Sequence, residues 1–598
     1  MIETILCEGT CHALKEKYHQ EVDPAAILIQ KTKKEFEGDL TLVIFPLSKL
    51  TGISPPSIGE EIGLFLKDHV PEVSSFQVVR GFLNIKITDA YWKEFFIQHH
   101  QDDHFGFRPQ TDSPPVVIEY SSPNTNKPLH LGHIRNNLLG YSLSRILNAN
   151  GQRVVKVNLV NDRGIHICKS MLAWEKWSGG ETPLKAGMKS DHLIGKYYVL
   201  FEKKYREEVE RMMKEGMTEE DALKKAPLIL EAQQLLKKWE SKDAATVRIW
   251  KMMNEWAYEG FEETYKRMGV EFDKVYYESD TYLLGKKMVE EGLQKGVVFR
   301  KEDGSVWVDL SAQGMDEKLL LRPDGTSVYI TQDLGTAQQR YDGFHPGRMV
   351  YVVGNEQIYH FNVLKATLKK LGRDWADNIF HLSYGMVELP QGKMKSREGK
   401  VVDADDLMDE MVETSGKMTA ALGKTEGLSE KEADSLIRMV GMAALKYFIL
   451  KVDPMKTMLF NPEESIDFTG NTGPFIQYTH ARIRSLMRKA REEFNYVPAD
   501  LSQVLSALEM NEKERTIVMI LHDFPSVVRE AAETYNPASI ANYVYELARE
   551  YNQFYQEYPV LREENKAVSD FRIELSAFTG QVVKKAMSLL GIEVPERM

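Results

Sequence analysis

Short apolar runs flank a long amphipathic stretch between residues 116 and 160. The run Val116 to Tyr120 is apolar except at Glu119, which is typical of a buried parallel strand. A helix is predicted from about Leu129 to Asn150, because the periodicity changes there and Gly151 follows as a C-cap. A second strand is predicted over Arg153 to Val160, so this part of the chain has the order of a βαβ unit.

The same alternation returns between residues 328 and 389. It predicts strands at 328–330, Met349 to Val353 and His381 to Leu389, with a helix from Phe361 to Leu371. The two halves together predict an α/β Rossmann-like domain with a doubly wound parallel sheet. The intervening residues, roughly 173–274, are charged and helical in pattern, and we interpret them as an insertion; a separate helical domain is the alternative.

The two ends of the chain differ in pattern from this centre. Helical periods near Ala13 to His19 and Ser57 to Leu66, with strand-like runs at Leu40 to Pro46 and Phe76 to Ile87, predict an N-terminal α+β domain. From about Ala404 the pattern is helical to the end, with several prolines as punctuation. The predicted domains are therefore 1–112, 113–403 (with the helical insertion at about 173–274) and 404–598, the last an all-α bundle.

Composition limits the class of protein. The 598 residues are 43% hydrophobic and 27% charged, with a net charge of −12, which is typical of a soluble globular protein and excludes a disordered chain. Three cysteines are too few for a disulfide framework or a Cys-rich zinc site, and residues 1–10 lack the apolar core of a secretory signal. We therefore expect a cytoplasmic protein without a structural metal. The acidic total argues against nonspecific coating of nucleic acid but leaves room for a local basic face.

The first chemical motif is SSPNTNKPLHLGHIRNN, at the junction between the first strand and its helix. Ligands of open α/β sheets bind at such junctions, and a helix N-terminus attracts anions. His130 and His133 share a helical face, Gly132 lies between them, and Lys127 adds a positive charge upstream. This arrangement suits the stabilisation of charge on a nucleotide phosphate. Half of a metal site is the alternative, but the sequence shows no third ligand motif.

The second motif is GKMKSREGK, residues 392–400, after the strand that ends at Leu389. Lys393, Lys395, Arg397 and Lys400 concentrate positive charge between glycines. Such a loop would stabilise a departing pyrophosphate. Taken alone, a solvated basic loop is the simpler interpretation.

Both motifs together, in this order, resemble those of the class I aminoacyl-tRNA synthetases: HLGH is similar to their HIGH motif and KMKSR to their KMSKS loop. The longer strings IEYSSPNTNKPLHLGHIRNN, YITQDLGTA, YVVGNEQIYHF and GPFIQYTHARIRSL resemble the arginyl-tRNA synthetases in particular. The resemblance extends from about residue 116 to 598. For residues 1–110 it depends on position alone, because that family carries a tRNA-contacting domain there.

The resemblance implies a set of functional residues. The implied catalytic residues are Lys127, His130, His133, Lys393, Lys395 and Arg397. The implied ATP-binding residues are His130, Leu131, Gly132, His133, Gly354, Met394 and Ser396. The implied arginine-binding residues are Glu119, Ser121, Asn124, Tyr329, Asp333 and Gln357. The implied tRNA-binding residues are Arg482, Arg484, Arg488, Lys489 and Tyr551.

An arginine pocket must neutralise one charge and satisfy five N–H donors. Asp333 would supply the charge, and strand alternation would point Tyr329, Thr331 and Asp333 the same way. The alternatives are a helix N-cap for Asp333 and ordinary packing for Tyr329 and Gln357. A pocket built on hydrogen bonds would need no editing.

Three positions depart from the family pattern. Ser396 stands where the KMSKS loop usually has its second lysine, and Lys127, Lys395 or Arg397 would substitute for it. Asn161 to Gly164 replaces the usual Gly-Asp-Trp-Gly, which puts the role of that loop in doubt. His166 stands where glutamine is usual.

Basic residues crowd one stretch of the C-terminal helices, from Arg482 to Arg491. Aromatic residues that include Tyr551 follow further on, and rings of this kind stack on unpaired bases. An aromatic stripe at helical spacing is also typical of a helical core.

The implied activity is an arginine–tRNA ligase. It would form arginyl-adenylate from arginine and ATP–Mg²⁺ and then transfer arginine to the 2′-hydroxyl of the terminal adenosine of its tRNA. We expect a monomer with tRNA, arginine and ATP as partners. The alternatives are a class I synthetase for another amino acid, a tRNA-binding relative without catalysis, and a small-molecule nucleotidyltransferase, which would not need the long helical C-terminus.

Overall fold

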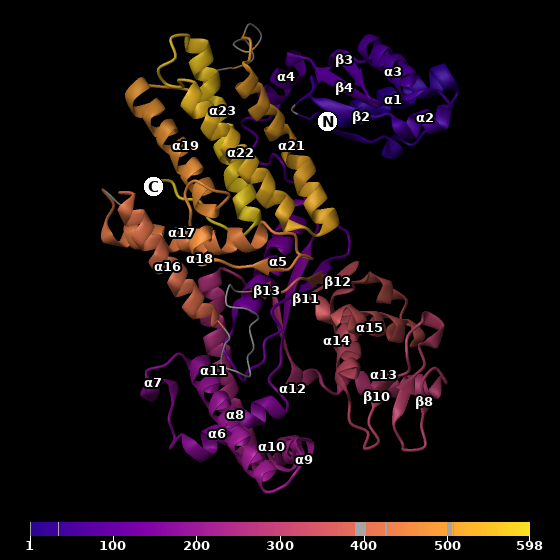
Figure 1. Cartoon of the computed structure of the whole chain (residues 1–598), viewed down its shortest axis with the longest axis vertical. Helices are drawn as coiled ribbons and strands as arrows, with labels where there is room; N and C mark the ends of the chain where they lie inside the picture. Colours follow the sequence, from indigo (N-terminus) through magenta and orange to yellow (C-terminus); the bar gives the residue numbers. More distant parts are fainter. Residues whose placement is uncertain are drawn as a thin grey trace. The chain divides into compact units, whose positions relative to one another are not determined.

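The computed structural model describes residues 2–33, 35–388, 402–424, 427–498, 501, 505 and 508–598. These residues form two compact units, each built from separate stretches of the chain (Figure 1). The first unit comprises 1–105, 486–523 and 549–579, and the second comprises 106–485, 524–548 and 580–598. Among the described residues, no helix combines the length and the apolar character needed to cross a membrane.

The first unit contains an antiparallel sheet in the order β1-β2-β4-β3. Its N-terminal elements are α1 (Ile2–Tyr18), β1 (Ile29–Lys31), β2 (Leu40–Val43), α2 (Phe45–Thr51), α3 (Pro55–His69), β3 (Val73–Val79), β4 (Phe82–Ile87) and α4 (Asp89–His99). The mixed α+β character is as predicted. The run predicted as one strand over 76–87 is part of a hairpin, because Arg80 and Gly81 adopt φ of 49° and 84° and reverse the chain.

The second unit contains a five-stranded sheet in the order β12-β11-β5-β6-β7, parallel throughout. The strands are β5 (Val116–Glu119), β6 (Val154–Val160), β7 (Lys274–Tyr277), β11 (Arg348–Gly354) and β12 (Ile379–Tyr384). The doubly wound sheet is therefore confirmed. The chain leaves β5 toward β6 and β7 on one side and later adds β11 and β12 on the other, so the switch point lies between β5 and β11. In such sheets the ligand site lies at the carboxyl ends beside the switch point.

Helices follow the strands of this sheet. They are α5 (Leu131–Ala149), α6 (Ile165–Trp177), α13 (Leu284–Gln294), α14 (Tyr329–Phe344) and α15 (Ile358–Lys370). Figure 1 shows α13, α14 and α15 side by side, in agreement with their contacts. The predicted strand at 328–330 is wrong: this stretch is the start of α14, which is capped by the extended residue Val328.

The predicted helical insertion is confirmed as a group of helices between β6 and β7. It contains α7 (Pro183–Ala186), α8 (Ser190–Lys214), α9 (Glu219–Lys225), α10 (Pro227–Glu240) and α11 (Ala244–Met268), and α6 packs with α8 and α10 (Figure 1). A short helix, α12 (Glu278–Thr281), follows β7. An antiparallel sheet that the sequence did not predict follows α13, with β8 (Phe299–Arg300), β9 (Val306–Val308) and β10 (Lys318–Leu321).

The described residues after 402 are almost entirely helical, as predicted. The helices are α16 (Ala404–Ala421), α17 (Glu430–Leu450), α18 (Pro462–Ser465), α19 (Gly473–Phe494), α21 (Glu512–Thr534), α22 (Pro537–Glu557) and α23 (Lys566–Leu589). A short strand, β14 (Met458–Leu459), pairs with β13 (Val387–Glu388). Pro525 does not end a helix but lies within α21, where it costs one backbone hydrogen bond.

Candidate active site

The two histidines of the first motif lie at the N-terminus of α5, where His130 is the extended N-cap residue. Nδ1 of His130 accepts a hydrogen bond from the N–H of Gly132 at 3.2 Å, and Nδ1 of His133 accepts one from the N–H of His130 at 3.1 Å. The two ring centroids are 4.0 Å apart. A nitrogen that accepts a hydrogen bond carries no proton, so each neutral ring carries its proton on Nε2. Both rings therefore have a fixed tautomer with Nε2–H as the remaining donor.

Burial keeps these rings neutral. It lowers the pKa of His130 to about 3, and the charge of Lys127 acts in the same direction. The pKa of His133 is lowered well below its usual value by burial and by its neighbours His130 and Lys127. Burial also lowers the pKa of Lys127. At neutral pH the two histidines are hydrogen-bond donors and not general acids.

Gly132, between the two histidines, lies close to the ring of His130. A Cβ at this position would lie 3.0 Å from Cε1 and 3.1 Å from Nδ1 of the His130 ring, which is tighter than ordinary contacts. A residue with a side chain here would have to displace the His130 ring, so the glycine favours the cap. Leu131 beside it is fully buried.

The segment that precedes α16 is bonded to this motif. The N–H of Leu131 donates to the carbonyl of Val402 at 3.1 Å, and the N–H of Ala404 donates to Leu129 at 2.9 Å. Val402 and Ala404, which come shortly after the second motif in the sequence, therefore lie beside the first motif. The predicted residues Lys393, Met394, Lys395, Ser396 and Arg397 themselves lie outside the described residues.

Lys189, which lies in the helical insertion, contacts the first turn of α16. Its Nζ lies 2.7 Å from Oδ2 of Asp405, 3.1 Å from Oδ2 of Asp191 and 2.6 Å from Oγ1 of Thr264. Hydrogen bonds from His192 and Lys189 outweigh burial and hold the pKa of Asp405 below its usual range. The first turn of α16 is therefore anchored by a buried, charged network.

A cavity of about 630 Å³ opens beside the carboxyl ends of the strands. Its lining includes Asn124, Glu278, Tyr329, Gln332 and Asp333. Tyr329 and Asp333 are one helical turn apart on α14 and share a face. The prediction that they lie together is thus confirmed, but by helical and not by strand periodicity.

The expectation that Thr331 points the same way is wrong, because its side chain is buried and donates to the carbonyl of Leu320. Asp333 is not an N-cap either, because it lies inside α14.

Glu278 is a further carboxylate of this cavity, one that the sequence reasoning missed. Burial raises its pKa to about 7, and the charges of Asp162 and Asp333 add to that rise, while Arg163 opposes it. Asp333 is oriented by His360, whose Nε2 lies 2.6 Å from its Oδ2. Its place in the sequence could have indicated it, because Glu278 directly follows β7, at the edge where ligands of parallel sheets bind.

The loop whose role the sequence left in doubt supports Glu278. Asp162 accepts hydrogen bonds from the N–H and Oγ of Ser279, at 2.8 and 2.7 Å, and from the hydroxyl of Tyr258 at 2.8 Å. The guanidinium of Arg163 lies 4.0 Å from the centroid of the Tyr282 ring. These contacts hold α12 and hence Glu278. His166, which replaces the usual glutamine, also lines the cavity.

Three predicted arginine-binding residues are not among the described residues that line this cavity: Glu119, Ser121 and Gln357. Glu119 is buried and forms an ion pair with Arg340. Ser121 is buried as well, with its Oγ 2.6 Å from the hydroxyl of Tyr265. The structure therefore neutralises the Glu119 carboxylate internally instead of presenting it to the cavity.

Gly354, predicted to contact ATP, lies at the carboxyl end of β11, the strand next to β5. Among the described residues, a Cβ there would meet nothing within 4 Å. Packing therefore does not explain the glycine.

The predicted tRNA-binding residues differ in exposure. Arg484 and Lys489 of α19 are exposed, and Arg482 and Arg488 are partly buried. Arg484 forms an ion pair with Glu596, and Arg482 lies 4.8 Å from the centroid of the Tyr478 ring. Tyr551 is fully buried beside Phe554. The expectation that Tyr551 stacks on a base is wrong for this structure, because the ring belongs to the core.

Comparison with known proteins identifies the family. Residues 101–461 match the family model "tRNA synthetases class I (R), catalytic domain", and residues 476–598 match "DALR anticodon binding domain". The chain is 57% identical to the arginine–tRNA ligase of Bacteroides thetaiotaomicron over 598 residues and 57% identical to that of Bacteroides fragilis over 599 residues, with 100% of each chain covered in both cases. The solved arginyl-tRNA synthetase of Thermus thermophilus shares the fold, with a TM-score of 0.81, 24% identity and 100% of both chains covered.

The fold and the first motif define a class I aminoacyl-tRNA synthetase. Within that class the chain belongs to the arginine–tRNA ligase family.

Proposed function

We propose that this chain charges tRNA with arginine in two steps, both at the α5 N-terminus and the cavity beside it. In the first step the carboxylate of arginine attacks the α-phosphate of ATP, which gives arginyl-adenylate and pyrophosphate. In the second step the 2′-hydroxyl of the terminal adenosine of tRNA attacks the arginyl carbonyl; the acyl–phosphate bond breaks, AMP leaves and the hydroxyl proton is released. The observation that carries this proposal is the pair of fixed Nε2–H donors at the switch point, next to a cavity whose lining includes the carboxylates of Asp333 and Glu278.

The histidines would act on the first step by electrostatics. The attack adds negative charge to the α-phosphate oxygens, and donors that are already oriented stabilise that charge without reorganisation. The Nε2–H groups of His130 and His133, the free amides of the first turn of α5 and the charge of Lys127 would supply these donors. Because both histidines are neutral, no proton needs to move in this step.

The leaving pyrophosphate would be neutralised by Lys393, Lys395 and Arg397, as predicted from the sequence. Leu131, Gly132, Gly354, Met394 and Ser396 stay predictions as ATP contacts. Mg²⁺ would arrive with ATP as part of the substrate.

The cavity supports arginine as the amino acid. Asp333 and Glu278 would complement the guanidinium, with Tyr329, Gln332 and Asn124 as further polar or stacking groups. A guanidinium placed between two carboxylates uses its forked geometry, which a lysine ammonium does not match. The arginine contacts of Glu119, Ser121 and Gln357 stay predictions. Glu119 could contact arginine only if its ion pair with Arg340 opened.

The helical C-terminal region would bind the anticodon. The description of the family model matched by residues 476–598 supports this assignment, as do the exposed side chains of Arg484 and Lys489. We retain the three-domain division at 1–112, 113–403 and 404–598 as a proposal about roles, with tRNA contacts at both ends of the chain. A monomeric, cytoplasmic enzyme is part of the same proposal, supported by three free cysteines.

The test is the charging of bulk tRNA with each of the twenty amino acids and with citrulline. Citrulline has the shape of arginine but carries no charge, so two carboxylates should reject it. We expect charging with arginine alone. Charging with lysine or citrulline at a comparable rate would contradict the assigned pocket.

A further inference from the structure

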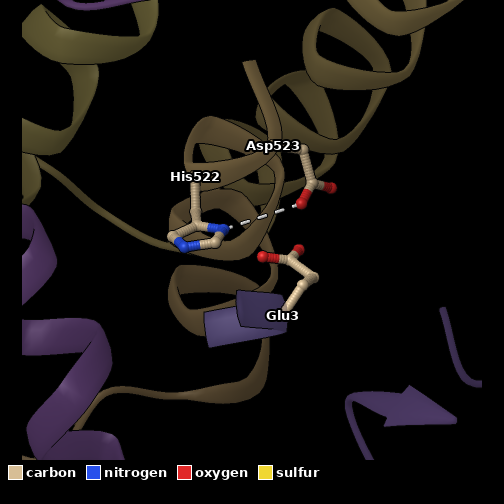
Figure 2. Close-up of side chains that lie close together, drawn as sticks. All are labelled: Glu3, His522 and Asp523. Atoms are coloured by element: carbon tan, nitrogen blue, oxygen red, sulfur yellow. Dashed lines mark ion pairs between the residues drawn. The ribbon is translucent and has the colours of Figure 1, made fainter. Parts of the chain in front are cut away.

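Three side chains with metal-ligand chemistry meet in the first unit. Glu3 lies in the first turn of α1, and His522 and Asp523 are neighbours on α21. Each offers one ligand atom, and these atoms all lie within 4.8 Å of one another. Figure 2 shows the carboxylate of Glu3 directed toward His522 and Asp523. This cluster belongs to a unit that contains none of the residues of the candidate active site.

The surroundings of His522 fix its ring. The side chain is 3% exposed, and its centroid lies 5.3 Å from the Trp92 ring and 4.9 Å from the Phe95 ring, both in edge contact. Nε2 lies 3.0 Å from the hydroxyl of Tyr91. Metal-binding histidines commonly engage the second ring nitrogen with an oxygen in this way. Nδ1 then faces the acidic side of the cluster, 3.8 Å from Oδ1 of Asp523.

The charges of the cluster are incompletely matched. Oε2 of Glu3 is buried and has no hydrogen-bond partner among the residues that the structure describes. Oδ2 of Asp523 pairs with Nζ of Lys31 at 2.6 Å, which leaves Oδ1 facing His522. A buried carboxylate oxygen without a partner is costly, and a cation placed among the three ligand atoms removes that cost.

A second group of similar composition shows the contrast. Asp191, His192 and Asp405 also lie within ligand distance of one another, but the ammonium of Lys189 lies 2.7 and 3.1 Å from their carboxylates. There the protein supplies its own cation. In the other cluster a lysine contacts the far oxygen of Asp523, and within the described part of the chain Oε2 of Glu3 has no partner.

We propose that Glu3, His522 and Asp523 bind a divalent transition-metal ion of the zinc type. One imidazole nitrogen and two carboxylate oxygens are ligands that zinc accepts, and three protein ligands leave one position for water. The ion would join the first turn of α1 to α21 within the first unit. It would have no part in the chemistry of the candidate active site.

The experiment uses the full chain, freed of metal and titrated with Co²⁺ and Zn²⁺. Glu3→Gln keeps the shape of the side chain and removes its charge. Glu8→Gln, an exposed position on the same helix, is the matched control. The two readouts are the visible absorption of bound Co²⁺, which is intense in four-coordinate sites, and the shift of the melting temperature with Zn²⁺.

We expect the wild type and Glu8→Gln to bind Co²⁺ with visible absorption and to melt at a higher temperature with Zn²⁺. Glu3→Gln should bind about tenfold or more weakly and lose the thermal shift. Equal binding by Glu3→Gln and the wild type would overturn the proposal. So would the absence of Co²⁺ absorption in the wild type at a tenfold excess of the ion.

Discussion

The carboxylate of Glu119 and the guanidinium of Arg340 form an ion pair in the interior of the second unit, with side chains 10% and 1% exposed. Glu119 is the last residue of β5, and Arg340 lies on α14, the helix that carries Tyr329 and Asp333. The pair therefore links the strand before the first motif to the helix that forms part of the cavity. Its loss should disturb stability before it disturbs chemistry.

Replacing Arg340 by methionine should lower the free energy of unfolding by about 3 to 5 kcal/mol, because it leaves a buried carboxylate without its partner. Denaturant unfolding measures this. Arg211→Met, at an exposed position on α8, should change it by less than about 0.5 kcal/mol. The double variant Glu119→Gln/Arg340→Met should recover part of the loss, since it removes the unpaired charge. A loss no larger than that of Arg211→Met would show that the pair is not structural.

Glu278 should make arginine use depend on pH. Burial raises its pKa to about 7, and a bound guanidinium favours the ionised form, so arginine binding below pH 7 must expel a proton. The value of kcat/KM for arginine should therefore rise with pH and be about tenfold lower at pH 6 than at pH 8. Glu278→Gln should lower kcat/KM and flatten this rise. Glu290→Gln, an exposed control on α13, should keep it, and a rise that persists in Glu278→Gln would assign it to another group.

The variant His133→Asn should keep the capping role of this side chain and remove its Nε2–H donor. The asparagine amide reaches the position of Nδ1, so it can still accept from the N–H of His130, but it has nothing at Nε2. We expect kcat for ATP–pyrophosphate exchange to fall by about a hundredfold to a thousandfold, with a melting temperature close to that of the wild type. His69→Asn, exposed in the first unit, is the control. Unchanged exchange in His133→Asn would remove this ring from the mechanism.

Lys189→Met tests the anchor of α16. The lysine contacts three oxygen atoms and has a side chain only 14% exposed, so its removal takes a cationic partner from the buried carboxylates of Asp191 and Asp405. We expect a loss of about 3 kcal/mol in unfolding free energy and a fall in kcat that exceeds any change in KM for arginine. Lys196→Met breaks a pair in which both partners are more exposed and should cost at most about 1 kcal/mol. A large loss of stability with unchanged kcat would limit Lys189 to a structural role.

The parallel sheet and the N-terminus of α5 could be predicted because their signals are local. A buried run, a helix with a glycine stop and a second run determine a βαβ unit, and the two histidines lie at its junction. The strand predicted at 328–330 was wrong because a short apolar run is compatible both with a strand and with the first turn of a helix. The β8–β10 sheet was missed because its strands have only two to four residues.

The cavity to which we assign arginine binding was only partly predictable from the sequence. Asp333 was predicted from the family resemblance. Glu278 belongs to no motif, and it can be recognised as a cavity residue only once β7 is placed at the edge of the sheet. The prediction for Tyr551 was wrong for a different reason. Aromatic residues at helical spacing occur both in cores and on binding faces, and the Tyr551 ring is buried in the core. The ion pair between Glu119 and Arg340 joins residues far apart in the sequence, which no local pattern reports.

ATP–pyrophosphate exchange with each of the twenty amino acids, with and without bulk tRNA, tests the central claim most directly. The account predicts exchange with arginine alone, and the family resemblance adds that exchange should appear only when tRNA is present. Exchange with another amino acid would contradict the assigned cavity. The absence of exchange from a folded protein, with arginine, ATP, Mg²⁺ and tRNA all present, would contradict the assigned activity and favour a tRNA-binding relative without catalysis.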